Sequence, residues 1–492
     1  MQSTFQKGKQ KMKAFREWSF ERYRPAVHKS DDIYVERIVP SPNGFEIEHS
    51  HLSPCMLFFR VADSDADFCS VPSRNGKVGV SGIEPDQEYE FYLSDGADSF
   101  SEHGFVHTGY APGTVVNYLS KRDSKYGFSG NYLCTPSLLC HPDGYMLASM
   151  DLYAPRGGQN LTLIFRSDDN GKTWHHLTEL FPCYWGTLFL HQNDVYLLGT
   201  STEYGDILIG KSTDGGKHWL LPTVIQRGSC NSAIPGWHKS SGHVVVYKGR
   251  LWCAYDYGAH TAGGHASALL SAPVESDLLD PFSWSITEPL SYNPAWKNAC
   301  IGDTRGFLEG NVVIGKDGGL YNILRYSMDR GSPKFGLAGM LKATVSDPEA
   351  SLQFEKFIPF PGNNSKFDIV YDEKEGRYWS IISRISDETC ATHRNLLSLI
   401  CSDDLSEWVT VKDLIDYTAY DPKQHGFQYV SFAICGDDIR FLCRTATNHA
   451  NSFHDSNYIT YHIIEKFREL RSQSAKQPMI HDKCCPEKSN KN

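Results

Sequence analysis

The stretch SDDNGKTW, residues 167–174, recurs as STDGGKHW at residues 212–219, forty-five positions further along the chain. Ser, Asp, Gly and Trp occupy the same offsets in both copies, which is typical of a tight turn followed by an anchored aromatic residue. Asp169 can accept backbone N–H bonds across such a turn, and Gly171 can adopt a positive φ. Trp174 would then begin the next strand and pack in the core. The repeated stretch therefore predicts how the chain folds rather than which reaction it performs.

Runs of strand length surround these turns from about residue 110 to residue 470. Examples are GYMLASMDLY, LTLIFRSDD, DVYLLGTST and RLWCAYDYG, each bounded by turn residues. No sustained helical periodicity occurs before EKFRELRS near the end of the chain. An internal period of about forty-five residues in an all-β region predicts a β-propeller, in which each repeat forms one four-stranded blade. The length of this region predicts six blades.

Residues 31–109 predict a separate small β-sandwich, because they contain short alternating runs such as CMLFFRVA and YEFYLSDG. Within them GIEPDQEYEFYL, residues 82–93, resembles the fibronectin type III stretch in which a loop leads into a tyrosine-bearing strand. Residues 1–30 form a charged segment, and the polar, Lys-rich tail 471–492 is expected to be disordered. The predicted fold class is thus all-β, with a six-bladed propeller over residues 110–470 preceded by a small sandwich.

The composition argues against several classes of function. The chain has 492 residues and a net charge of −10, which disfavours a nucleic-acid partner or an anionic membrane surface. No apolar run approaches the ~20 residues of a membrane helix, and the opening MQSTFQKGKQKMKAFREW lacks the apolar core of a secretory signal. The fourteen cysteines, which have no regular spacing, are then expected to be reduced thiols of a cytoplasmic protein. No metal-ligand spacing such as HExxH and no Gly-rich phosphate loop occurs, so neither a metal nor a cofactor is expected.

The turn pattern Ser-x-Asp-x-Gly-x-Thr-Trp resembles the Asp-box of the sialidase superfamily, with a degenerate third copy in SDDLSEW, residues 402–408. The resemblance implies a propeller whose Asp-boxes lie away from the active site, an exo-acting glycoside hydrolase and an oligosaccharide substrate. Four residues match the superfamily's site. Glu309 and Arg325 flank the hairpin in EGNVVIGKDGGLYNILR, Arg394 opens RNLLSLICSDD, and Tyr429 lies in FQYVSFAIC.

The resemblance also implies a role for each of these four residues. Tyr429 would be the nucleophile, Glu309 its base, and Arg325 and Arg394 a clamp on the substrate carboxylate. An anomeric carbon that carries its own carboxylate repels an anionic nucleophile, and a neutral Tyr activated by a Glu avoids that repulsion. Guanidinium groups bind carboxylates in bidentate fashion.

Two positions depart from the superfamily pattern. The first clamp arginine would fall at Cys134 in NYLCTPSLLC, and the general-acid aspartate would fall near Gln159 and Asn160. Asp151 is the nearest acidic side chain before the first repeat, and Arg156 is a candidate replacement for the missing guanidinium. Loss of catalytic groups costs orders of magnitude in rate. The expected substrate is therefore a terminal sugar, acidic sugars included, other than an ordinary sialoside.

Other polar residues near the matched set could repair the site. They are His425 ahead of Tyr429, His454 and Asp455 in NSFHDSNYITYH, Arg305 near Glu309, and His238 and His243 in GWHKSSGHVVV. We predict His425 or His454 as the replacement acid or base, because imidazole titrates near neutral pH. Asp455 and Arg305 are predicted to contact the substrate.

Two other functions would use the same residues. A polysaccharide or oligosaccharide lyase needs a group that neutralises a carboxylate and a base that takes the proton α to it, and Arg, Tyr and His can supply both. A non-catalytic carbohydrate-binding propeller would keep the fold and lose turnover with the arginine missing at Cys134. The sequence gives neither the sugar and its linkage nor the oligomeric state.

Overall fold

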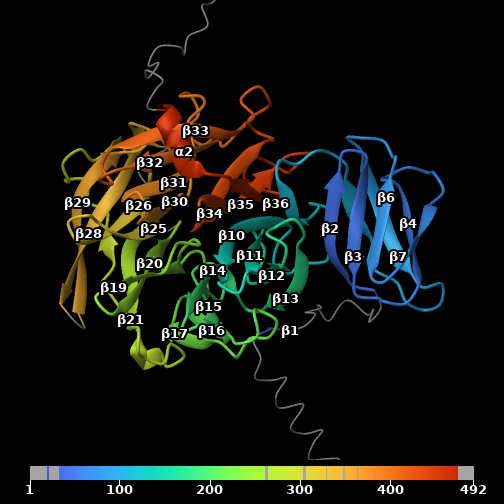
Figure 1. The fold of residues 1–492 in the computed structure, drawn as a ribbon, viewed down its shortest axis with the longest axis horizontal. Helices are drawn as coiled ribbons and strands as arrows, with labels where there is room; N and C mark the ends of the chain where they lie inside the picture. Colours follow the sequence, from blue (N-terminus) through green and yellow to red (C-terminus); the bar gives the residue numbers. More distant parts are fainter. Residues whose placement is uncertain are drawn as a thin grey trace, which may run out of the picture.

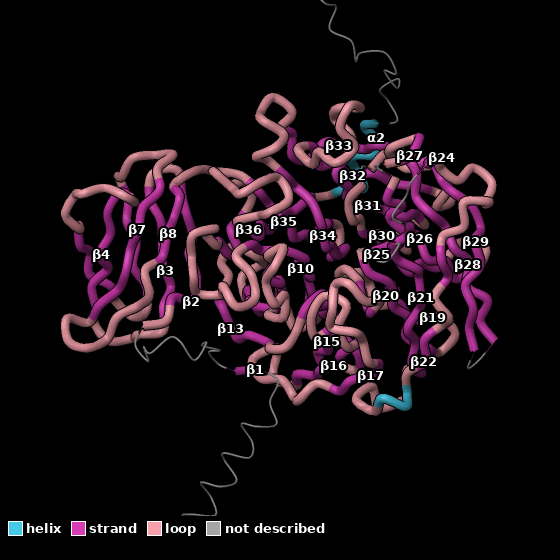
Figure 2. Tube along the Cα trace, turned by 180° about the vertical axis from the view of Figure 1, so that it is seen from behind, coloured by secondary structure: helices cyan, strands magenta, loops and turns pink. Residues whose placement is uncertain are grey.

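The computed structural model describes residues 33–260, 264–302, 306–328, 330–346, 349–362 and 364–474, together with the backbone of 19–20. Figure 1 shows a small body of N-terminal strands beside a larger ring of sheets. In the described residues helix is confined to η1 (Pro281–Ser283) and α2 (Phe467–Ser474), which stand out in Figure 2 among strands and loops. The prediction of an all-β chain is confirmed. Arg305 lies outside the described residues, as do nearly all of residues 1–30.

The N-terminal body consists of two antiparallel sheets. One contains β2 (Val35–Ser41), β3 (Gly44–His49) and β6 (Lys77–Ser81), and the other β5 (Cys69–Ser73), β4 (Cys55–Val61), β7 (Glu88–Ser94) and β8 (Gly104–His107). Alternate residues such as Leu57, Phe91 and Phe45 point inward and are buried together, as the period of a strand requires. The hydroxyl of Tyr89 accepts a hydrogen bond from the backbone N–H of Glu84 at 3.1 Å, which ties the strand to the preceding loop. Likeness to fibronectin type III stays a prediction.

The larger body contains four four-stranded antiparallel units, and three of them follow the chain outward from an inner strand. The first is β10 (Tyr132–Cys140), β11 (Met146–Tyr153), β12 (Thr162–Ser167) and β13 (His175–Leu180), extended at its edge by β1 (Ser19–Phe20). The second is β14 (Tyr184–His191), β15 (Asp194–Thr200), β16 (Ile207–Ser212) and β17 (Thr223–Gln226). Late in the chain come β30 (Asp368–Asp372), β31 (Arg377–Ser383), β32 (Leu396–Ser402) and β33 (Trp408–Asp416), then β34 (Gly426–Cys435), β35 (Asp438–Ala446), β36 (Tyr458–Ile464) and β9 (Thr114–Tyr118).

Between these units lies a ten-stranded sheet. Its first part contains β18 (Gly236–His238), β19 (Val245–Tyr247), β20 (Arg250–Ala259), β21 (Gly264–Pro273), β22 (Ser285–Ile286) and β23 (Leu290–Ser291); its second contains β25 (Gly306–Ile314), β26 (Leu320–Ser327), β28 (Leu337–Ser346) and β29 (Glu349–Pro359). A single parallel pair, His265 with Gly306, joins the two parts, and the short strands β24 (Ile301–Gly302) and β27 (Gly331–Ser332) pair separately. The number of six blades stays a prediction, because this sheet divides only at that pair.

The ring closes through strands that are far apart in sequence. β9 precedes β10 to β36, yet it forms the outer edge of the sheet that contains β34, β35 and β36. The inner strand β10 contacts β14 on one side and β34 on the other, and β30 contacts β25 and β34. The inner strands thus converge on one centre, as in a propeller.

The repeated turns join the third and fourth strands of their sheets. In the first copy Ser167 Oγ donates to Asp169 at 2.9 Å, and Asp169 accepts the backbone N–H of Thr173 at 2.9 Å. The second copy repeats these bonds, with His218 Nδ1 2.6 Å from Asp214 where Thr173 Oγ1 contacts Asp169 in the first. Gly171 has φ +82°, and a Cβ there would collide with the ring of Tyr461. Trp174 and Trp219 are fully buried between neighbouring sheets. These turns fix the packing and lie on the third-to-fourth strand connections.

The sandwich is joined to the closing sheet of the ring. Arg37 of β2 donates to the carbonyls of Val115 and Val116 in β9, at 2.6 and 2.8 Å. Tyr118 of β9 and Tyr458 of β36 belong to the same hydrophobic cluster as the sandwich core. The predicted domain boundary at residue 109 falls between β8 and β9, and the first residues of the predicted tail, 471–474, belong to α2. No helix among the described residues is long and apolar enough to cross a membrane.

Candidate active site

Four inner strands carry the same backbone irregularity where they face the centre of the ring. Strands β10, β14, β25 and β34 each shift register against the next strand, and one residue of each shift has a positive φ. These residues are Thr135 (φ 41°), Trp185 (56°), Glu309 (58°) and Tyr429 (53°). A left-handed conformation costs a non-glycine residue roughly 1–2 kcal/mol, and β-bulges commonly re-aim a side chain beside an active site. The strained positions therefore mark the centre as functional.

Tyr429 and Glu309 are in direct contact there. Tyr429 Oη donates a hydrogen bond to Glu309 Oε1 at 2.5 Å. Arg325 Nη1 donates to Glu309 Oε2 at 2.8 Å and to Tyr429 Oη at 3.2 Å. All three lie on different strands, β34, β25 and β26. The structure thus brings together residues that are up to 120 positions apart in the sequence.

Two further arginines flank the Tyr429 ring. The Cζ atom of Arg394 lies 5.7 Å from the ring centroid, and that of Arg444 lies 5.1 Å from it. Arg394 donates to Gln428 and to the carbonyl of Asn364, and Arg444 donates to the carbonyl of His454. Among the described residues, the buried Nε atoms of Arg325, Arg394 and Arg444 have no hydrogen-bond partner. All three arginines also line the central cavity, where their guanidinium groups can meet a ligand.

The sequence prediction missed Arg444, although the hairpin carries a signal for it. Cys435 and Asp438 face each other at the turn between β34 and β35. Counting an equal number of residues along both strands from this pair places Arg444 opposite Tyr429, and the bulge in β34 moves the partner of Arg444 to Gln428. Arg444 is therefore the third guanidinium of the centre, supplied by the strand next to the nucleophile candidate.

The charges of this cluster perturb one another. Burial alone would raise the pKa of Glu309, but Arg325, His238 and the Tyr429 hydroxyl outweigh it and hold the pKa below its usual range. Burial and the Glu309 charge raise the pKa of Tyr429, against the influence of the arginines. Burial, together with Arg325, lowers the pKa of Arg394 to about 9. The resting site thus holds a neutral Tyr beside an ionised Glu, in surroundings that carry an excess of positive charge.

A second layer orients Glu309. Asp256 of β20 accepts the backbone N–H of Glu309 at 2.7 Å, and His238 Nδ1 lies 3.2 Å from the same carboxylate oxygen. The His238 ring lies 4.9 Å from that of His265. The bond to Asp256 supports the positive φ at Glu309 and thereby the direction of its side chain.

These groups line a cavity of about 630 Å³. Its aromatic walls are Tyr153, Tyr184 and Trp185, and Phe453 covers another side. Glu203, on the loop between β15 and β16, also lines the cavity, and burial raises its pKa. Volumes of roughly 300–1,000 Å³ with few convergent polar groups are typical of small-ligand sites. The cavity is large enough for a sugar ring and part of a leaving group.

The structure places the other predicted residues at different distances from this cavity. His454 lines it, and burial together with Arg444 lowers its pKa to about 4. His425 does not line it and instead packs against Tyr417 and Tyr420, with ring centroids 5.3 and 5.5 Å away. Asp455 contacts His454 and Asn451, each at 2.8 Å, and lines a different cavity.

Asp151 and Arg156 also lie away from the cavity lining. Asp151 is fully buried in β11, where it accepts a hydrogen bond from Thr162 at 2.5 Å and burial raises its pKa to about 8. Arg156 is exposed on the loop after β11. Both lie near the first blade as predicted from the chain order, but neither faces the cavity.

The two positions that depart from the superfamily pattern are filled by small or neutral groups. Cys134 is buried with its Sγ 3.7 Å from the hydroxyl of Tyr184, and burial raises its pKa to about 12. Gln159 donates to the carbonyl of Ala154 at 3.0 Å and contacts Glu203. The cavity-facing acid in this region is therefore Glu203, which the sequence prediction missed because it lies on the next blade.

No family model and no curated protein sequence matches this chain. Among solved structures, a leech intramolecular trans-sialidase in complex with 2,7-anhydro-Neu5Ac is 10% identical, with a TM-score of 0.49 over 94% of this chain and 96% of that one. An intramolecular trans-sialidase from Ruminococcus gnavus, in complex with oseltamivir carboxylate, is 13% identical, with a TM-score of 0.48 over 75% and 100%. An α-L-arabinanase from Penicillium chrysogenum, complexed with arabinobiose, is 15% identical, with a TM-score of 0.47 over 73% and 98%. At this level the chain is similar to these proteins in overall arrangement, and no residue takes its role from them.

Proposed function

We propose that this chain is a glycoside hydrolase that releases a terminal sugar carrying a carboxylate. The observation that carries the proposal is the contact of Tyr429 Oη with Glu309 at 2.5 Å in a cavity that also holds three arginines. A tyrosine paired with a carboxylate is an activated nucleophile, and guanidinium groups recognise carboxylates. The sialidase-like arrangement predicted from the sequence uses these residue types in the same roles.

In the first step Tyr429 Oη forms a bond to the anomeric carbon while its proton passes to Glu309 Oε1. Glu309 is ionised at rest, because its pKa is held low despite burial by Arg325 and His238. The phenol itself does not ionise first, since burial and Glu309 raise its pKa. Proton transfer and attack are therefore coupled, and the 2.5 Å contact supplies the path for the proton.

The glycosidic C–O bond breaks in the same step, and its oxygen needs a proton. Glu203 is the candidate acid, because it lines the cavity and burial raises its pKa. His454 is a weaker candidate, since a pKa of about 4 leaves it unprotonated at neutral pH. Water then attacks the anomeric carbon, Glu203 takes a proton from that water, and Tyr429 leaves with the proton held by Glu309.

Arg325, Arg394 and Arg444 would bind the substrate carboxylate. All three line the cavity, and guanidinium N–H groups donate hydrogen bonds to carboxylate oxygens. The sugar ring would lie against Trp185, which lines the cavity. The Glu203 position, on a different blade from the aspartate expected by resemblance, supports a substrate other than an ordinary sialoside. The predicted cytoplasmic location would fit small oligosaccharides.

The test compares the wild type with Tyr429→Phe and Glu309→Gln on unsaturated, uronic, sialic and neutral oligosaccharides. Tyr420→Phe, an exposed tyrosine outside the cavity, is the matched control. Released reducing sugar and ultraviolet absorbance are read in the same wells. We expect reducing sugar without new absorbance, reduced at least about a hundredfold in both site variants. Wild-type rates in both variants would remove the assignment.

The same wells separate the two alternative functions. A lyase leaves a carbon–carbon double bond, so absorbance would rise with cleavage. A non-catalytic propeller would give neither signal, and calorimetry on the same panel would then show binding whose affinity alone is changed by Tyr429→Phe. Either result would replace the hydrolase proposal.

A further inference from the structure

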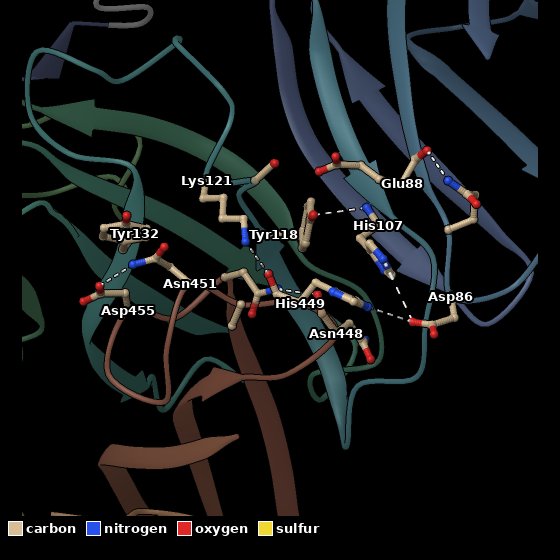
Figure 3. A pocket seen from close by; sticks show the side chains of 14 residues that line it. Asp86, Glu88, His107, Tyr118, Lys121, Tyr132, Asn448, His449, Asn451 and Asp455 are labelled. Atoms are coloured by element: carbon tan, nitrogen blue, oxygen red, sulfur yellow. Dashed lines mark hydrogen bonds and ion pairs between the residues drawn. The ribbon is translucent and has the colours of Figure 1, made fainter. Parts of the chain in front are cut away.

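A second cluster of chemically active side chains lies where the sandwich meets the ring, away from the central cavity. Asp86 lies on the loop before β7, His107 ends β8, and His449 lies on the loop between β35 and β36. Figure 3 shows the three side chains pointing toward one another across the junction. One ligand atom from each lies within 4.8 Å of the others. The cluster therefore joins residues from both bodies.

The distances between the candidate ligand atoms are close to those of a metal site. His449 Nε2 lies 3.4 Å from Asp86 Oδ1, and His107 Nε2 lies 4.0 Å from the same oxygen. Two ligands that each lie about 2.0–2.1 Å from a tetrahedral Zn²⁺ are about 3.3–3.5 Å apart. Closing the longer pair by about half an ångström would bring both within that range. The set of two imidazoles and one carboxylate is one that zinc accepts.

The buried histidine is oriented as a metal ligand would be. His107 Nδ1 lies 3.0 Å from the carbonyl of Thr108, so a proton on Nδ1 leaves the Nε2 lone pair directed at Asp86 and His449. Metal-binding histidines commonly use their second nitrogen in this way. His107 is 7% exposed, whereas the side chains of Asp86 and His449 are 78% and 64% exposed. The ion would thus have one fixed ligand, two adaptable ones and an open side for water.

The backbone around the cluster is held in an unfavourable conformation. Asp86, Asn448 and His449 have φ values of 52°, 45° and 58°. Asn448 donates to the carbonyl of Tyr110, and Lys121 donates to the carbonyl of His449 at 3.2 Å (Figure 3). Non-glycine residues with positive φ cluster at ligand sites, where the surroundings support the strain. Two of the three candidate ligands carry this strain.

We propose that Asp86, His107 and His449 form a binding site for a divalent transition metal, with Zn²⁺ the preferred ion and water from the adjoining cavity of about 260 Å³ as the fourth ligand. The loop between β35 and β36 carries His449 near its start and Phe453 and His454 further on, and the latter two line the central cavity. A bound ion would therefore pin one wall of the active site to the sandwich. The site is independent of the reaction proposed above.

The first experiment measures zinc binding to the full-length chain after treatment with a chelator. Equilibrium dialysis and calorimetry are applied to the wild type, Asp86→Asn and His449→Ala. His103→Ala, an exposed histidine of the sandwich outside the cluster, is the matched control. We expect the wild type and the control each to bind one equivalent of zinc. The affinity for zinc should be at least about a hundredfold weaker in the two site variants. Both changed side chains are exposed, so the fold should survive, and circular dichroism checks this.

Cobalt(II) provides an independent reading of the ligands. Nitrogen and oxygen ligands give visible d–d absorption without the intense ultraviolet band of a thiolate, so cysteine sites elsewhere in the chain are distinguished. Hydrogen exchange of residues 447–457 should slow on adding zinc to the wild type and remain unchanged in His449→Ala. The proposal is overturned if the wild type binds no zinc at 100-fold excess over protein, or if both site variants bind it as tightly as the control does. A thiolate spectrum would also overturn it.

Discussion

The excess of positive charge in the central cavity makes a quantitative prediction about ligand choice. Arg325, Arg394 and Arg444 surround Tyr429, and Glu309 is an anion in direct contact with Arg325. Replacing the carboxylate of a sugar acid by a primary amide preserves its size and removes its charge. We expect the acid to bind much more tightly than the amide. The perturbation therefore lies in the ligand, and the folded protein stays unchanged.

The size of the expected difference in affinity between acid and amide can be worked out from the pKa of Arg394. Burial, with Arg325 and Arg444 close by, lowers the pKa of this guanidinium from 12.5 to about 9. At about 1.4 kcal/mol for each factor of ten, its charged form is disfavoured by about 5 kcal/mol. A guanidinium nevertheless keeps its proton in proteins. The free-energy cost of its buried charge therefore remains until an anion binds beside it. If a carboxylate recovers half of this free energy, the acid binds roughly sixtyfold more tightly than the amide.

Calorimetry on the sialic and uronic acids of the panel and on their amides measures this ratio. Arg394→Met should lower the acid-to-amide ratio below about tenfold, because the side chain keeps its volume and loses its charge. Arg156→Met, at an exposed position outside the cavity, should leave the ratio unchanged. If acid and amide bind the wild type within threefold of each other, the cavity is not an anion site and the assigned substrate class is wrong.

Three further predictions concern stability and the division of roles. Burial raises the pKa of Asp151 to about 8 from 3.8, so the folded chain retains a proton that the unfolded chain releases. The stability of the fold should therefore fall as the pH rises from 4 to 8. Thermal melts over this range should show a smaller decline for Asp151→Asn. Trp174→Ala should lower the free energy of unfolding in urea by about 3–5 kcal/mol, whereas Phe282→Ala, at 94% exposure, should change it little. His454→Ala should reduce kcat/KM severalfold, because the contact of its ring Nδ1 with Arg444 Nη2 at 3.4 Å is lost while the hydrogen bond from Arg444 to the backbone carbonyl at position 454 remains; His425→Ala should leave kcat/KM within threefold.

The organisation of the chain could be predicted from the sequence because its signals are local. The turn around Asp169 repeats at a fixed period, and each copy closes on itself through bonds within seven residues. In the region of the predicted propeller, helix is expected near EKFRELRS, and α2 forms there. Blade number is harder to predict, because β18 to β29 form one continuous sheet. That continuity depends on where His265 meets Gly306, which is a long-range contact without a local pattern.

The site could be predicted only in part. Its residues come together only when the ring of sheets closes, and their side-chain directions depend on strained backbone conformations. Glu309, Arg325, Arg394 and Tyr429 are predicted by the resemblance to the sialidase superfamily, and the structure brings them together. The direction of the Glu309 and Tyr429 side chains depends on β-bulges in which these residues have a positive φ. Bulky residues rarely adopt a positive φ, and no pattern in this sequence predicts where the bulges occur. His425 was chosen for its nearness to Tyr429 in sequence. The loop before β34 instead directs it toward Tyr417, away from the centre.

The exchange at Cys134 is best understood as a limit on how much positive charge the centre can hold. Arg444 already lowers the pKa of Arg394, and its charge also acts on the Cys134 thiol. A fourth guanidinium at position 134 would add to the repulsion among buried cations, of which Arg325 is in contact with the Glu309 carboxylate. Cys134 is neutral, small enough to pack beside Tyr184, and leaves three arginines around Tyr429. The cavity therefore keeps three guanidinium groups although position 134 is a cysteine. The third group is that of Arg444, which lies on β35, the strand paired with the Tyr429 strand β34.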